Sequence, residues 1–306
     1  MPNCWPAGPS RPGDTGLTGP DAALRLERLL GAGVRECRGL GGQHGVRHCR
    51  ATLDDGRVVF AKIAGAAAGG AAGFEAEARG LRWLGEAGAV PVPEVAGWDE
   101  AALVISWLPE EAPSRQAAER FGRDLARMHA AGPQAYGAPW PGVIAGLPLG
   151  NDPGDSWPEW YAAERLLPFA RRARDAGSLT PADVRLVEAV AARIADLAGP
   201  AEAPSRIHGD CWSGNVMWSG GRGWLIDPAA HGGHRETDLA MLALFGAPFL
   251  ARIIACYEEV TPLAAGWPHR VPLHQLHPLL VHVCLFGGAY RTAALDAARA
   301  ALAQTP

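Results

Sequence analysis

The stretch that decides the fold runs from Ile207 to Asp227. It begins Ile-His-Gly-Asp-Cys-Trp-Ser-Gly-Asn-Val-Met-Trp, passes through the turn Ser-Gly-Gly-Arg-Gly, and ends Trp-Leu-Ile-Asp. Two glycines in its first half favour an open loop, and the Gly-rich turn between two apolar runs predicts a β-hairpin. The stretch therefore presents two acids and an amide, Asp210, Asn215 and Asp227, on one loop and the hairpin that follows it.

This order of polar residues is typical of a phosphotransferase catalytic loop. In kinase-like enzymes an Asp accepts the proton of the substrate hydroxyl, an Asn of the same loop binds metal, and an Asp on the next hairpin holds Mg²⁺ against the ATP phosphates. We assign Asp210 as the catalytic residue, and Asn215 and Asp227 as the metal ligands. The alternative is a polar surface hairpin without chemistry, but such turns seldom combine these three residues at this spacing.

Composition limits the class of protein. The chain has 306 residues, 48% hydrophobic and 20% charged, which suits one or two soluble domains. Its formal net charge of -4 argues against a general binder of nucleic acid or of anionic membranes. The six cysteines form no Cys-x-x-Cys pair, and no uninterrupted apolar run approaches the length of a membrane span. We expect reduced thiols, no membrane or nucleic-acid partner, and a cytoplasmic protein.

The N-terminal third has the pattern of a small antiparallel sheet. Residues 1–20 are rich in Pro and Gly and are expected to form a flexible tail, followed by a helix over 22–30 with Asp21 as its N-cap. Three strands follow, and a Gly-rich turn over 38–45 joins the first two. Backbone N–H groups near Gly41 and Gly42 could approach phosphates closely because these residues have no Cβ atoms.

Lys62 is the only lysine among 28 basic residues, at the end of the third predicted strand. A compact ammonium differs from a guanidinium fork, and it suits a strand residue that reaches ATP phosphates while pairing with a helix carboxylate. The predicted helix over 74–85 offers Glu75 and Glu77. We favour Glu77 because it lies beside the apolar stripe of that helix.

A short apolar strand over 102–105 is broken by Ser-Trp-Leu-Pro, which a two-lobed kinase would use as its hinge. Backbone groups there would bind the adenine edge while Trp107 or Leu108 contacts the ring, although an ordinary strand end fits equally well. Helices are predicted over 114–131, 157–176 and 181–197, with Ser156 and Thr180 capping the last two. His129 is interpreted as a core histidine, and the Pro- and Gly-rich loop over 132–155 could close over a substrate.

Residues after Asp227 predict a helix that starts at Glu236 or Thr237. Asp238, early in it, could accept hydrogen bonds from catalytic-loop N–H groups and support the loop. His231 and His234 could suggest a metal pair, but the sequence shows no third ligand at suitable spacing. We therefore do not assign them to a metal.

These motifs together resemble the fructosamine-3-kinase (ketosamine-3-kinase) family, within the aminoglycoside-phosphotransferase and choline-kinase group. The resemblance rests on His-Gly-Asp-Cys-Trp-Ser-Gly-Asn from position 208, Asp-Pro-Ala from 227 and Gly-His-Arg-Glu-Thr-Asp from 233. It implies an α+β, two-lobed protein-kinase-like fold: an antiparallel-sheet N-lobe over 21–106, then a hinge and a larger, mostly helical C-lobe over 107–306. It further implies ATP, Mg²⁺ and phosphorylation of the sugar 3-hydroxyl of a glycated amine, small or protein-bound, which leads to deglycation.

The substrate site is expected around Trp212, as a stacking wall for the sugar, and around His234 and Glu236 of the family motif. Two departures from the family pattern bear on it: Cys211 adds a thiol where Leu is usual, and Gly232 lacks an aromatic ring near the expected substrate mouth. The alternatives are a kinase of aminoglycosides or other small-molecule hydroxyls, and a catalytically silent nucleotide-binding regulator. The intact set of Lys62 with Asp210, Asn215 and Asp227 counts against the regulator. The sequence leaves the oligomeric state open.

Overall fold

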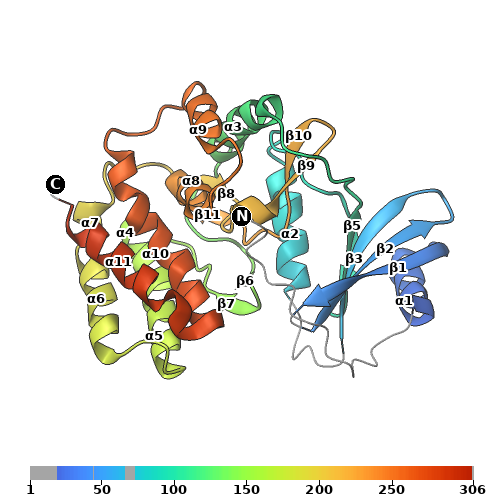
Figure 1. Ribbon diagram of the computed structural model, residues 1–306, viewed down its shortest axis with the longest axis horizontal. Helices are drawn as coiled ribbons and strands as arrows, with labels where there is room; N and C mark the ends of the chain where they lie inside the picture. Colours follow the sequence, from blue (N-terminus) through green and yellow to red (C-terminus); the bar gives the residue numbers. More distant parts are fainter. Residues whose placement is uncertain (1–18, 44, 66–72, 305–306) are drawn as a thin grey trace.

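Two parts of unequal size make up the fold, a sheet with few helices and a larger helical part (Figure 1). The computed structural model describes residues 19–43, 45–65 and 73–304. Most of the expected tail therefore lies outside the described residues. The small part contains one five-stranded antiparallel sheet in the order β1-β2-β3-β5-β4. Its strands are β1 (Val34–Gln43), β2 (Val46–Leu53), β3 (Val58–Ala64), β4 (Val95–Asp99) and β5 (Ala102–Ser106).

Each face of the sheet is covered by one helix. Alternate residues of β3, Val59, Ala61 and Ile63, are buried in a cluster that includes residues of α1 (Gly19–Leu30). Because side chains alternate along a strand, Lys62 lies on the opposite face, where α2 (Phe74–Gly85) packs. Period-two alternation thus directs the only lysine toward α2.

Two boundaries in this part differ from the sequence prediction. The glycines at 39, 41 and 42 belong to β1 itself, which runs on to Gln43, so the predicted turn is much shorter. A register shift between Gly39 and Gly41 accommodates them in the ladder, and Gly41 has φ of 95°. Helix α1 begins at Gly19, two residues before the N-cap predicted at Asp21.

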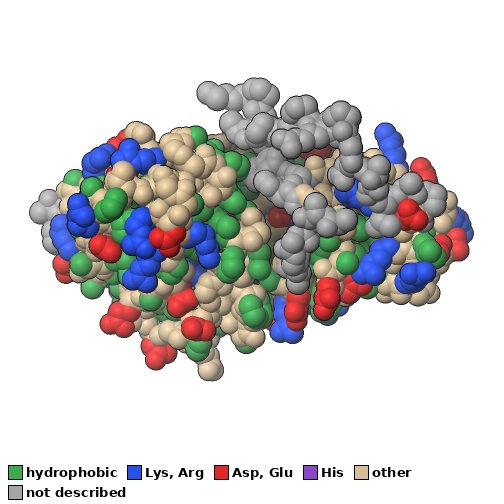
Figure 2. All heavy atoms as spheres, turned by 90° about the horizontal axis from the view of Figure 1, so that it is seen from below, with side chains coloured by type: hydrophobic (Ala, Val, Ile, Leu, Met, Phe, Trp, Pro, Cys, Tyr) green, Lys and Arg blue, Asp and Glu red, His purple; other side chains and the backbone are tan. Residues whose placement is uncertain are grey.

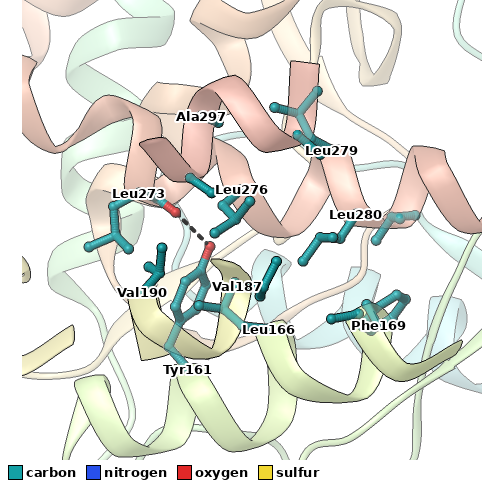
Figure 3. Packing of buried hydrophobic residues seen from close by; sticks show 14 of the residues in the cluster. Tyr161, Leu166, Phe169, Val187, Val190, Leu273, Leu276, Leu279, Leu280 and Ala297 are labelled. Carbon is teal, nitrogen blue, oxygen red and sulfur yellow. Dashed lines mark hydrogen bonds between the residues drawn. The ribbon is translucent and has the colours of Figure 1, made fainter. Parts of the chain in front are cut away.

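Helices dominate the larger part and enclose its main core. Tyr161 is buried among leucines and valines of several helices, and its hydroxyl donates to the carbonyl oxygen of Leu273 at 3.1 Å (Figure 3). The helices are α3 (Arg115–Ala130), α4 (Trp157–Tyr161), α5 (Leu167–Asp175), α6 (Pro181–Ala192), α7 (Ile194–Leu197), α8 (Arg235–Leu244), α9 (Leu250–Glu258), α10 (Trp267–Phe286) and α11 (Arg291–Leu302).

The predicted helices are present, with changes at caps and in their interiors. Thr180 caps α6 as predicted, and Asp183 completes a capping box that the prediction did not include. Ser156, by contrast, makes no capping hydrogen bond with its side chain. The helix predicted over 157–176 contains a π-helical turn, η1 (Ala162–Leu166), and the one over 181–197 breaks at Arg193. Helix α8 begins at Arg235, before the predicted start at Glu236 or Thr237, and His234 caps it.

The predicted loop over 132–155 contains a short hairpin, β6 (Gly142–Ile144) and β7 (Leu147–Leu149). One helical stretch in the described residues, 267–302, has the length and apolar composition of a membrane span. The apolar residues of α10 contribute to the main core of the protein, where Leu273, Leu276 and Leu280 pack. The surface seen in Figure 2 shows acidic and basic side chains interspersed on its described parts.

Candidate active site

The catalytic loop follows β8 (Ser205–Ile207) and includes the one-turn 3-10 helix η2 (Ser213–Asn215). Gly209 has φ of 80°, and a Cβ atom there would lie 2.3 Å from the carbonyl oxygen of Ala229, so a glycine is required. The Asn215 Nδ2 donates to the Asp210 backbone oxygen at 2.9 Å and to its Oδ2 at 3.0 Å. The loop thus fixes the Asp210 carboxylate beside the Asn215 amide.

Asp210 has the electrostatic environment of a general base. Burial raises the pKa of its carboxyl to about 7, the Asp227 carboxylate adds to this rise, and the Asn215 hydrogen bond opposes it. A carboxyl that titrates near neutrality can both accept and release a proton under ordinary conditions.

Asp227 follows β10 (Arg222–Leu225), which pairs with β9 (Val216–Ser219) in the predicted hairpin. Its φ of 54° is unusual for a residue with a side chain and marks a sharp change of chain direction. The Lys62 Nζ donates to both Glu77 oxygens at 2.9 Å and also bonds the Asp227 Oδ1. Although burial works to lower the pKa of Lys62, the two carboxylates raise it, so the ammonium stays charged.

Asp238 accepts hydrogen bonds from backbone N–H groups of the catalytic loop, the kind of contact expected of it. Its carboxylate accepts the backbone N–H of His208 at 2.7 Å and that of Gly209 at 3.0 Å. The buried His129 ring lies between this carboxylate, at 3.1 Å, and the Tyr257 hydroxyl, at 2.9 Å. His129 is therefore a core histidine, as expected, and it also holds the residue that supports the catalytic loop.

His208 is a positioning residue to which sequence reasoning gave no role. Its Nε2 lies 2.8 Å from the Ile226 carbonyl oxygen, and its Nδ1 accepts the Asp210 N–H at 3.2 Å. One neutral tautomer satisfies both bonds, with the proton on Nε2. The ring thereby links the catalytic loop to the end of β10, just before Asp227. The position of His208 directly before Gly209 and Asp210 was the sequence feature that could have predicted this role.

The donor set beside Asp210 suits Mg²⁺. The side chain of Asp227 is 41% exposed, which leaves carboxylate oxygen accessible next to Lys62. Because the Asn215 Nδ2 points at Asp210, its Oδ1 is left for another partner. Carboxylate and amide oxygens are ligands that a hard cation prefers. Asn215 and Asp227 thus fit the metal assignment by residue type and placement.

The candidate nucleotide residues lie in, or directly after, strands of the sheet that carries Lys62. Gly41 and Gly42 lie in β1, two strands away across the sheet, and a Cβ at Gly42 would lie 2.3 Å from the Val46 carbonyl oxygen. Trp107 directly follows β5, and its N–H extends the ladder by donating to the Val58 oxygen at 3.1 Å. Leu108 is buried. Their roles in binding ATP stay predictions.

Trp212 is half-buried on the catalytic loop, two residues after Asp210. A Cβ at Gly214 would lie 2.1 Å from the Trp212 ring, so the indole lies over that glycine. The Phe245 ring lies 5.8 Å from the Trp212 ring between centroids. Cys211 is fully buried in a hydrophobic cluster, and this burial raises the pKa of its thiol well above the ordinary value. The thiol is therefore not presented to substrate.

Three expectations for the substrate site need correction. Glu236 is 1% exposed, and both of its oxygens accept hydrogen bonds from Arg270. His234 is buried against Trp157 and caps α8, so neither residue is placed to touch a substrate. Gly232 is buried too, because it forms a backbone bridge with Gly137, and a ring there would clash with the loop.

His234, Glu236 and His274 have ligand atoms within 4.8 Å of one another, and the sequence did not show His274 as a third member. The Glu236 carboxylate of this group, however, is already paired with the Arg270 guanidinium. That guanidinium supplies the positive charge that a metal ion would otherwise provide. The cluster is thus explained as a buried ion-pair network behind the catalytic loop.

Comparisons with known proteins point to one family. Residues 34–304 match the family model described as fructosamine kinase. A probable ketoamine kinase of Synechocystis is 34% identical over 228 residues, which cover 71% of this chain and 75% of the relative. A probable ketoamine kinase of Thermus thermophilus is 36% identical over 218 residues, 71% of this chain and 78% of the relative.

Solved structures agree. A protein from Thermobifida fusca, provisionally named a fructosamine-3-kinase, is 54% identical with a TM-score of 0.89 and covers 92% of this chain and 98% of its own. The aminoglycoside phosphotransferase APH(4)-Ia is 18% identical with a TM-score of 0.62, covering 92% of this chain and 100% of its own. That second likeness concerns the fold, and it confirms the predicted kinase-like architecture.

Proposed function

The chain belongs to the fructosamine kinase family, and on that premise we propose that it uses Mg·ATP to phosphorylate the sugar 3-hydroxyl of a ketoamine. The observation that carries the proposal is the Asp210 carboxylate, fixed by Asn215 and raised in pKa to about 7, beside the Lys62 and Asp227 pair. Phosphoryl transfer needs three groups together: a carboxylate that accepts the proton of the substrate hydroxyl, ligands for the metal ion, and a cation that contacts the phosphates.

Asp210 orients the sugar hydroxyl and takes its proton as the oxygen attacks the γ-phosphate. Lys62, held by Glu77, is the cation that contacts the ATP phosphates. Asn215 and Asp227 would hold Mg²⁺, which would neutralise charge on the phosphates when bound. Gly41 and Gly42 would lie over the phosphates, and Trp107 and Leu108 would contact the adenine. Asp238 supports the loop through His208 and Gly209.

A ketoamine suits this site better than a polycationic aminoglycoside. The loop over 132–155 carries two acids, Asp152 and Asp155, which offers little attraction for several positive charges. Trp212 beside the base gives a flat aromatic wall for a sugar. Once a proton is lost from C1, a phosphate on C3, next to the carbonyl carbon, can leave as inorganic phosphate. Water then hydrolyses the C1 imine that results, so we expect the product to decay and free the amine. We further propose that the protein acts in the cytoplasm, where the five described cysteines, all free thiols, would stay reduced.

The direct test is ADP release over a substrate panel. We expect Mg²⁺-dependent turnover with fructosyl- and ribulosyl-amines, and little with aminoglycosides or choline. Asp210→Asn serves as the blank, because it keeps the fold and removes the base. Turnover confined to aminoglycosides would move the protein to that class, and nucleotide binding without any turnover would make it a regulator.

A further inference from the structure

A row of five rings begins at the catalytic loop and continues across the helical part. It consists of Trp212, Phe245, His282, Phe286 and Tyr290, which we call the aromatic row. Ring centroids lie 5.8 Å apart from Trp212 to Phe245 and 5.2 Å from Phe245 to His282. From His282 the row reaches Tyr290 at 4.7 Å and Phe286 at 5.6 Å. These spacings are those of aromatic rings in contact.

Local structure explains how distant residues form the row. His282 and Phe286 are four residues apart in α10 and therefore share one face of the helix. Gly287, with φ of 65°, ends α10 and starts the 3-10 turn η3 (Gly287–Tyr290), which brings Tyr290 back onto the His282 ring. Phe245 caps the end of α8, next to the catalytic loop.

The row is partly open to solvent. Phe286 is 40% exposed, and Trp212, Phe245, His282 and Tyr290 are half-buried. Burial lowers the pKa of His282, and its Nδ1 donates to the Pro278 carbonyl oxygen at 2.7 Å. The ring is thus neutral, with Nε2 as a hydrogen-bond acceptor. The row offers aromatic faces and one acceptor, a surface for apolar groups and for an ammonium rather than for an anion.

The row is longer than a sugar needs. One ring, Trp212, matches the width of a sugar ring, and the other four rings extend the aromatic surface beyond it. A ketoamine carries its amine substituent on the carbon next to the sugar carbonyl, so this substituent must leave the site along some surface. The aromatic row is continuous with Trp212 and has the chemistry to receive an apolar substituent together with the charged amine.

We propose that Phe245, His282, Phe286 and Tyr290 bind the amine substituent, so that the preferred substrates are ketoamines of aromatic or large apolar amines. This inference rests on the proposed function and refines its substrate class. Truncation of an outer ring should remove contact with a large substituent and matter much less for a small one.

The test compares ribulosyl-benzylamine with ribulosyl-methylamine by kcat/KM. In the wild-type protein we expect a preference of about 10-fold or more for the benzyl adduct. Phe286→Ala and Tyr290→Ala should each reduce this ratio to below about 3-fold, mainly through KM of the benzyl adduct. Phe249→Ala is the matched control, because Phe249 is 43% exposed at the start of α9 and lies outside the row. Its ratio should equal that of the wild type.

The outcomes separate this inference from the function itself. Equal efficiency with both adducts, or a ratio unchanged in Phe286→Ala and Tyr290→Ala, would overturn the role of the row while leaving the kinase activity in place. No turnover of either adduct would instead remove the proposed function. If Phe286→Ala altered the oligomeric state by light scattering but not the ratio, the row would be a contact between copies, and the inference would fail.

Discussion

A single ammonium group, that of Lys62, bonds carboxylates from both parts of the molecule. Glu77 comes from α2, and Asp227 comes from the end of the hairpin that follows the catalytic loop. All other basic side chains of the chain are arginines or histidines. The guanidinium group of arginine is larger and planar, and its donors have a fixed geometry. It therefore cannot take the same position between two carboxylates and the phosphates.

Lys62→Arg should therefore lose activity although charge is kept. We expect kcat/KM for ATP to fall by about 100-fold or more, with a folded protein by circular dichroism. Arg57→Lys, an exposed exchange in the β2–β3 turn, is the control and should change little. Near-normal turnover in Lys62→Arg would show that Lys62 has another role.

Asp210→Asn removes the proton acceptor but keeps the shape of the side chain. We expect kcat to fall by about 1,000-fold while the Kd for ATP, measured by calorimetry, changes little, because the base acts on the acceptor and not on the nucleotide. A large loss of ATP affinity with kcat preserved would contradict this division of roles.

The same substitution should change how stability depends on pH. The folded pKa of Asp210 is about 7 and lies above the ordinary value of 3.8 for an Asp. The folded state therefore holds a proton that the unfolded state releases, and the stability this provides is lost as pH rises through about 7. Asp210→Asn cannot ionise, so without Mg²⁺ or nucleotide its melting temperature should exceed that of wild type at pH 8 by on the order of a few degrees, and by less at pH 5. A constant difference at the two pH values would show that Asp210 titrates normally.

Among the elements, α8 has the closest connection to the chemistry. Its first turn supplies Asp238, whose two oxygens accept N–H groups of the catalytic loop. Each accepted bond offsets part of the cost of burying the carboxylate, so removal of Asp238 would leave buried donors without an acceptor.

Asp238→Ala should consequently lose both stability, by about 2–4 kcal/mol, and kcat, by about 10-fold or more. Asp183→Ala is a matched control, since Asp183 is also a buried carboxylate that accepts backbone and side-chain bonds at a helix start, far along the chain in α6. It should lose stability, by urea unfolding, with kcat unchanged. If both variants kept kcat, Asp238 would be only structural.

The sequence predicted those features, such as strands, helices and helix caps, that depend on residues close together in the chain. The strand pattern and the helix pattern predicted that Lys62 pairs with Glu77, and Thr-Pro predicted the N-cap of α6. Contacts between distant segments escaped prediction. Glu236 looked available to substrate because its partner Arg270 lies 34 residues further on, and only the packing of α10 on α8 brings them together. The π-helical turn at η1 was likewise not predicted, because the apolar stripe of the helix does not record a local change in backbone hydrogen bonding.

At the level of the whole molecule, α2 lies between the sheet and the helical part (Figure 1). A Cβ at Gly80 would lie 3.2 Å from the Ala230 Cβ and 3.3 Å from the Pro228 Cγ, so this glycine lets α2 approach the segment after Asp227. That approach holds Glu77, and through it Lys62, at a fixed distance from the catalytic hairpin.

Gly80→Leu should push the two parts away from each other at this contact. We expect kcat/KM for ATP to fall by about 10-fold or more, although leucine favours the helix more than glycine does. Arg79→Leu, on the exposed side of the same helix, is the control and should retain activity. Unchanged kinetics in Gly80→Leu would mean that the contact does not set the distance between Lys62 and Asp227.

The measurement that tests the central claim most directly is the position of the transferred phosphate. The protein is incubated with Mg·ATP and a fructosyl- or ribulosyl-amine, and the product is followed by mass spectrometry and by phosphorus–proton NMR. We predict a product heavier by one phosphate, with coupling that places it on the sugar O3, followed by decay to the free amine. Phosphate on another oxygen, or a product formed only from aminoglycosides, would contradict the assignment of this site to ketoamine phosphorylation.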